Sequence, residues 1–140
     1  MGLFSRDLIL LHAPSVYDFR SRAGFLGPVS DVVPSTPVFE MYPVGFTTIA
    51  QRLEDEGFNV RIINVAYRML QDPLYDPEQE LAGLKPALFG IDLHWLPHAH
   101  GAIELARVVK RLHPNIPIVL GGLSASYFQR ELIEYPGWTS

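Results

Sequence analysis

The chain has 140 residues, a formal net charge of −4 at pH 7 and no cysteine. This length predicts a single domain. The acidic balance, with scattered rather than clustered Lys and Arg, argues against a nucleic-acid-binding surface. Without cysteine the chain can form no disulfide, thiolate metal site or iron–sulfur ligation of its own. The first apolar run, Leu8 to Leu11, is too short for a signal sequence or a membrane span, so we expect a cytoplasmic protein with no membrane partner.

Four short aliphatic runs alternate with helical patterns along the chain. The runs are typical of buried parallel strands, and they are DLILLHAP, FNVRIINV, PALFGID and IPIVLGG. The helical patterns cover residues 43–57, 77–84, 97–113 and 124–133. In the first of these, Pro43 suits the opening position and Gly57 suits a left-handed cap at the end.

The alternation of strand and helix predicts an α/β fold with a doubly wound, flavodoxin-like or Rossmann-like parallel sheet in three layers. Residues 15–42 form a long loop with several aromatic side chains, which we expect to pack across one end of the sheet. Such a sheet usually has one strand more than the sequence provides. We therefore expect residues 1–140 to be one domain cut from a longer protein.

In open α/β sheets, ligands bind beyond the carboxyl ends of the strands, where the strand order reverses. The first, third and fourth predicted strands end in segments that meet at this edge. Neither G-x-G-x-x-G nor G-x-x-x-x-G-K-[ST] occurs, which argues against the standard phosphate-binding loops. The candidate ligand-binding residues are His12, Pro14, Asp92, Leu93, His94, Trp95, Gly121, Gly122, Leu123 and Ser124.

The window GIDLHWLPHAHG holds an aspartate and three histidines. Residues two apart on a strand share a face, so Asp92 can orient the His94 ring and leave its other nitrogen for a metal. Alternatively, Asp92 caps a helix and His94 faces solvent. His12 is less suited to a metal, because Pro14 constrains its turn and no acidic residue adjoins it in sequence.

A metal site built from His94, His98 and His100 is a further alternative, and it would suit a metal-dependent hydrolase. Two observations argue against it. His98 and His100 stand at a helix start, two residues apart, and therefore point in different directions. The helix N-terminus also carries a positive partial charge, which opposes a cation.

Three segments together resemble a known family. MYPVGFTTIAQRLEDEGFNVRIINV is similar to the Y-P-x-G stretch of cobalamin-binding domains fused to radical SAM enzymes. PALFGIDLHWLPHAHGAIELARVVKRLHPNIPIVLGGLSAS resembles the third strand, helix and fourth strand of those domains, with their G-G pair, and LILLHAPS resembles their first strand. The chain departs from the pattern in two places. It lacks D-x-H-x-x-G after the first strand, and Asp92-Leu93-His94 stands where the family more often has S-x-L.

The resemblance implies a corrinoid (cobalamin) held at the carboxyl ends of the strands. The Asp92–His94 spacing, which is not the family's usual pattern, makes His94 the candidate ligand of its metal. It also implies a downstream radical SAM domain of the same polypeptide, whose three cysteines bind a [4Fe–4S] cluster and S-adenosylmethionine. The reactions of such enzymes include methylation and oxidative cyclisation, and no catalytic residue is expected in this chain. The alternative is a flavodoxin-like module that binds another ligand or a partner without a corrinoid.

Overall fold

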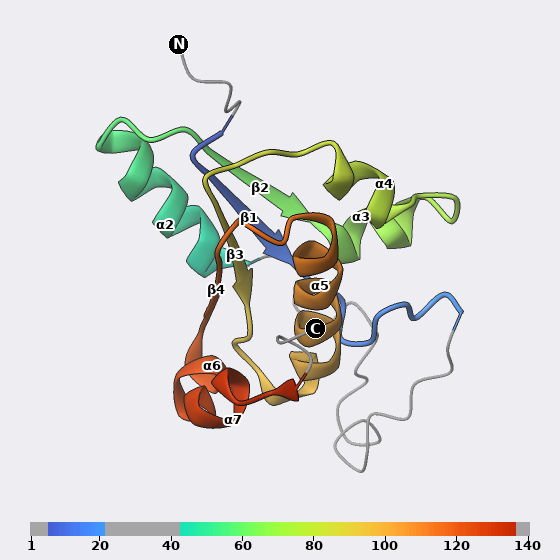
Figure 1. Ribbon diagram of the computed structural model, residues 1–140. Coiled ribbons are helices and arrows are strands. Elements are labelled where there is room, and N and C mark those ends of the chain that lie inside the picture. Colours follow the sequence, from blue (N-terminus) through green and yellow to red (C-terminus); the bar gives the residue numbers. More distant parts are fainter. Residues whose placement is uncertain (1–5, 22–42, 137–140) are drawn as a thin grey trace.

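The computed structural model describes residues 6–21 and 43–136. In this part of the chain, four parallel strands form a sheet in the order β2-β1-β3-β4, with helices on both faces (Figure 1). The predicted α/β flavodoxin-like fold is therefore confirmed. Most of the predicted loop 15–42 lies outside the described residues, and so does its expected packing across the sheet.

The strands lie inside the predicted aliphatic runs. They are β1 (Leu8–His12), β2 (Val60–Asn64), β3 (Leu88–Asp92) and β4 (Ile118–Gly121). The helices are α2 (Val44–Asp55), α3 (Val65–Gln71), α4 (Pro77–Ala82), the 3₁₀ turn η1 (Leu96–His98), α5 (Ala99–Leu112), α6 (Leu123–Tyr127) and α7 (Gln129–Ile133).

Alternating strand residues supply two hydrophobic cores on opposite faces of the sheet. The main core joins the sheet to α3, α4, α5 and α6, and its buried members include Ile9, Leu11, Phe89, Ile91 and Leu105. The second core is smaller and holds α2 against the other face, through Leu8, Leu10, Phe46 and Val60. The alternation follows from the pleat of the strands, because neighbouring side chains point to opposite faces.

Local signals explain both ends of α2 and the start of α4. Helix α2 begins directly after Pro43, and Gly57 follows its end with φ +91°, a conformation that favours glycine. Helix α4 has Pro77 at its first position, and the Asp76 side chain accepts bonds from two backbone N–H groups of its first turn.

Three details differ from the prediction. Helix α3 was not predicted; it starts at the residue after β2, with the Asn64 side chain accepting from Tyr67 N. The helix predicted over residues 124–133 is two short helices, which break at Phe128. The helix predicted from Pro97 begins with the η1 turn instead.

Strand β4 forms one edge of the sheet. Its Val119 is half-exposed on the face where α2 packs, and an apolar hollow of about 360 Å³ lies on the other face, lined partly by Ile118 and Leu120. The expected additional strand stays a prediction. Within the described residues, none of the helices combines the length and the hydropathy that a membrane crossing requires.

Candidate functional site

The carboxyl ends of β1, β3 and β4 meet at one edge of the sheet. Leu11 pairs with Ile91, and Asp92 pairs with Gly121, so these strands finish at the same level. The chain leaves β3 and β4 through short connections, and Leu93 N, just after β3, donates to the carbonyl oxygen of Gly121, the last residue of β4, at 2.7 Å. The convergence expected from the sequence is therefore present, and it brings His12, Asp92 and Gly121 together.

A buried pair forms between the ends of β1 and β3. The Nδ1 atom of His12 lies 2.6 Å from Oδ2 of Asp92, and the imidazole is only 1% exposed. The ring of His98 stands edge-on to that of His12, with 5.9 Å between their centroids. The imidazole is thus enclosed beneath the edge of the sheet, with its Nδ1 engaged by a carboxylate.

This pairing corrects the sequence argument. The sequence predicts Asp92 beside His94 and gives His12 no acidic neighbour along the chain, but the strand register pairs Asp92 with His12. The two-residue rule fails here because β3 ends at Asp92, so His94 is no longer on a regular strand. Asp92 does not cap a helix either, since η1 has no side-chain cap.

The second carboxylate oxygen of Asp92 is the unusual atom of this region. Oδ1 is buried and has no hydrogen-bond partner in the described part of the chain. An unpaired buried acceptor destabilises a protein by roughly 1–3 kcal/mol. Such an atom therefore marks a position where a donor from outside the chain is favoured.

His94 and Trp95 follow β3 and lie at the surface. Both side chains are exposed, and their rings meet edge-on with 5.5 Å between centroids. Between them and the strand, Leu93 points into the main core. The backbone carbonyl of His94 accepts from both the N–H and the hydroxyl of Ser124, so this serine fixes the connection after β3.

The glycine pair after β4 has two distinct roles. Gly122 adopts φ +112°, and a Cβ atom there would stand 2.9 Å from the backbone of His94. Only glycine fits such a close approach without displacement of the chain. A Cβ atom on Gly121 would meet nothing within 4 Å, because this residue borders open space.

That space is a hollow of about 270 Å³ between the carboxyl ends of β3 and β4 and the first turns of α2. We call it the rim hollow. Its lining residues are Pro43, Val44, Gly45, Phe46, Ile49, Asp92, His94, Gly121 and Gly122. Among the described residues of this lining, Asp92 and His94 have polar side chains, and the others are apolar, proline or glycine.

The predicted site residues divide into two groups. Asp92, His94, Gly121 and Gly122 line the rim hollow. The others do not line it, and they are His12, Pro14, Leu93, Trp95, Leu123 and Ser124. The sequence analysis did not predict that α2 supplies a wall of the hollow. The signal was available, because the helix that follows a parallel strand begins near the carboxyl end of the sheet.

Comparison with known families decides the class of this domain. Residues 31–139 match the model of the B12 binding domain. This chain belongs to the B12-binding domain family. The match includes everything from α2 onwards, and therefore all residues of the rim hollow. Recognition as a cobalamin-binding domain is thus confirmed.

One curated relative gives further context for this B12-binding domain. The chain is similar to the hopanoid C-3 methylase of Methylococcus capsulatus, with 27% identity over 101 residues. The alignment covers 71% of this chain and 19% of the relative, so the chain spans about a fifth of that protein's length. No solved structure matches the chain.

The rim hollow fits part of a corrinoid. Its apolar walls and bare glycine backbone suit a flat ring, and the buried oxygen of Asp92 offers an acceptor to a donor on that ring. Exposed apolar side chains surround the edge of the sheet and suit a larger face above it; they are Val44, Trp95, Leu96 and Leu123. Among the described residues, no group of three or more histidines and acids has the arrangement of a metal site.

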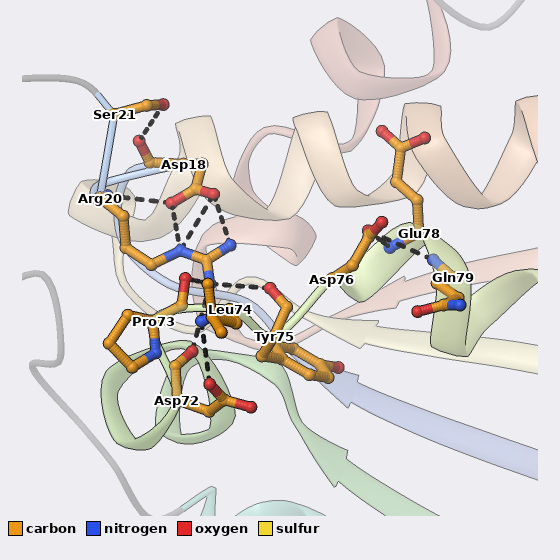
Figure 2. A network of polar contacts seen from close by, with 10 residues as sticks. All are labelled: Asp18, Arg20, Ser21, Asp72, Pro73, Leu74, Tyr75, Asp76, Glu78 and Gln79. Carbon is orange, nitrogen blue, oxygen red and sulfur yellow. Dashed lines mark hydrogen bonds and ion pairs between the residues drawn. The ribbon is translucent and has the colours of Figure 1, made fainter.

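On the face of the sheet that carries the main core, a polar network anchors the segment after β1 (Figure 2). The guanidinium of Arg20 is paired with the carboxylate of Asp18, with 2.7 Å between Nη2 and Oδ2. The same guanidinium donates to backbone carbonyls of the α3–α4 connection, including that of Tyr75 at 2.8 Å. The hydrogen bonds from Arg20 hold the pKa of Asp18 below its usual value.

Two tyrosines beside this network are hard to ionise. Burial, helped by the nearby charge of Glu78, raises the pKa of Tyr17 from 10.0 to about 12. Burial also raises the pKa of Tyr75, whose hydroxyl donates to Glu80. Tyr17 further donates its backbone N–H to the ring of His100 at the start of α5. The segment after β1 is therefore tied to two separate helical connections.

Proposed function

We propose that this chain holds the corrinoid of a larger radical SAM enzyme, such as a methyltransferase or an oxidative cyclase. The corrin lies over the carboxyl ends of β1, β3 and β4, and the base of its nucleotide tail enters the rim hollow. The observation that carries this proposal is the family match combined with a hollow whose lining belongs to the matched region.

The size of the rim hollow supports this division of the ligand. A cavity of ~150 Å³ holds one benzene ring, so about 270 Å³ suits a bicyclic base and is far too small for a corrin macrocycle. The macrocycle must then lie outside, against the exposed apolar side chains of the edge. Val44, Trp95 and Leu123 offer such contacts.

In this arrangement, His94 is the residue that would ligate cobalt. Its side chain is exposed, lines the rim hollow, and makes no hydrogen bond within the described residues. The buried His12 is engaged with Asp92 and is enclosed beside His98, so it orients the carboxylate instead. When bound, the corrinoid supplies a redox-active cobalt suited to one-carbon transfer, while this chain binds and orients it.

The wider enzyme is proposed on two grounds. The sequence resembles cobalamin-binding domains fused to radical SAM enzymes, and the similar relative is named a methylase and is about five times as long as the matched region. Because the chain has no cysteine, a [4Fe–4S] cluster with its S-adenosylmethionine belongs to another part of the polypeptide, downstream of this domain.

A titration with hydroxocobalamin tests the proposal. The chain is mixed with the cofactor, desalted, and its retained corrinoid is measured by absorbance. We expect retention. Because the base of cobalamin is itself a nitrogen ligand, the spectrum is recorded with cobinamide, which lacks that base, and it should show a nitrogen ligand that His94→Ala removes. The matched control is His100→Ala, which deletes an exposed histidine outside the rim hollow.

Two results would overturn parts of the proposal separately. Absence of retained corrinoid removes the proposed function and favours the flavodoxin-like module without a corrinoid. Retention with an unchanged spectrum in His94→Ala leaves the corrinoid in place and removes the axial role of that histidine.

A further inference from the structure

The rim hollow contains one feature that governs which ligand it accepts. Asp92 is held from one side, where Oδ2 accepts from the Nδ1 of His12 at 2.6 Å. Its other oxygen, Oδ1, is buried without a hydrogen-bond partner in the described residues. The side chain lines the hollow and is 14% exposed, so it adjoins the space that a ligand enters.

A carboxylate accepts hydrogen bonds and donates none. The remaining oxygen of Asp92 therefore favours a group with an N–H or O–H and disfavours a group that presents a lone pair. Oδ1 itself is covered, so a donor reaches it when rotation about the broad last torsion of the aspartate turns it toward the hollow, and the His12 ring must follow to keep its bond to Oδ2. Among the described residues that line the hollow, His94 is the one other polar side chain, and the rest are apolar side chains, proline and glycine.

We propose that Asp92 makes this domain selective for corrinoids whose lower base carries an N–H donor, such as adenine. The inference rests on the proposed entry of the base into the rim hollow. The detached dimethylbenzimidazole of cobalamin presents a ring nitrogen with a lone pair and no hydrogen. Adenine presents an exocyclic amino group instead. A buried carboxylate distinguishes these two bases by the direction of one hydrogen bond.

The expected discrimination follows from the two outcomes for Oδ1. With adenine the buried acceptor is satisfied, whereas with neutral dimethylbenzimidazole it stays unpaired opposite a second lone pair. We expect the adenine corrinoid to bind roughly tenfold more tightly, which corresponds to about 1.4 kcal/mol.

The experiment compares dissociation constants for cobalamin, its adenine-containing analogue, and cobinamide, which lacks the nucleotide. The variants are Asp92→Asn, which keeps the shape and adds donors, and Asp92→Ser. Glu54→Gln is the matched control, because it removes one negative charge from an exposed position of α2 outside the hollow. Wild type and control should prefer the adenine corrinoid, and both Asp92 variants should lose that preference. Affinity for cobinamide should be the same in all four proteins.

The outcomes separate this inference from the proposed function. Failure of the wild type to bind any of the corrinoids overturns the proposed function. Binding without preference for the adenine form, or with a preference that Asp92→Asn leaves intact, overturns the role of Asp92 and keeps the corrinoid. The wild-type preference is measured on the unaltered chain, so a poorly folding variant does not remove the test.

Discussion

Replacing Gly101 with alanine should destabilise the domain, although alanine is the better helix former. Gly101 is in the first turn of α5, and its N–H donates to the carbonyl of Ser15 at 3.1 Å. A Cβ atom there would stand 1.6 Å from the carbonyl oxygen of Pro14, less than half of an ordinary non-bonded contact of about 3.5 Å. The neighbouring atom is backbone, so it cannot swing aside as a side chain would.

The free energies can be compared term by term. Alanine contributes about 1 kcal/mol of helix propensity. Displacement of the segment after β1 loses the hydrogen bond to Ser15, which stabilises by about 1 kcal/mol, and overpacking costs about 1–3 kcal/mol. We therefore expect Gly101→Ala to lower the free energy of unfolding by about 1–3 kcal/mol.

Urea denaturation followed by circular dichroism measures this change. A loss of about 2 kcal/mol moves the midpoint by roughly 1 M in a domain of this size. Gly45→Ala in α2 is the matched control, since nothing lies within 4 Å of its Cβ position, and it should raise stability by up to about 1 kcal/mol. Equal stabilisation by both substitutions would refute the steric argument.

Three further predictions concern other parts of the domain. Gly122→Ala should lower the free energy of unfolding by about 1–2 kcal/mol, because of its φ of +112° and the approach of His94, and should weaken corrinoid retention; unaltered stability and retention would contradict it. Arg20→Gln should destabilise the fold by about 1 kcal/mol or more, and a double-mutant cycle with Asp18→Asn should show coupling. Because the pKa of Asp18 is lowered in the folded protein, its contribution to the free energy of unfolding is present above pH 3.8, the ordinary pKa, and is lost as the pH falls below that value. Arg20→Gln should therefore make the free energy of unfolding less dependent on pH in the acid range. Because the pKa of Tyr17 is raised to about 12 in the folded protein, its contribution to the free energy of unfolding is complete below pH 10 and is lost as the pH rises toward 12. Tyr17→Phe should reduce the loss of stability in alkaline denaturation, and an unchanged denaturation curve would contradict this role of Tyr17.

The strands were predictable because each is a continuous aliphatic run with polar or turn residues around it. Helix α3 was not, because β2 passes into it without a turn and Asn64 serves as both the last strand residue and the helix cap. Its opening residues Val65 and Tyr67 also favour strands, which hides the boundary. The break at Phe128 has neither glycine nor proline to announce it.

The candidate site was predictable as an edge and not as a set of contacts. Strand order and equal strand ends place His12 and Asp92 at one level. The spacing along the chain instead predicts His94 as the partner of Asp92, because it does not include neighbours across the sheet. The opposite wall of the rim hollow, from Pro43 to Ile49, depends on how α2 packs. The angle at which α2 packs on the sheet is set by tertiary contacts with Leu10 and Val60, which no local sequence pattern specifies.

The unequal sizes of the two cores have a kinetic consequence. One wall of the rim hollow is the end of the sheet, fastened by the main core, while the facing wall is the start of α2, fastened by the second core. Trimming an aliphatic side chain such as Val60 loosens the facing wall without touching any atom of the ligand. For the corrinoid that we propose at this site, we therefore expect the residence time to depend on residues that take no part in its recognition.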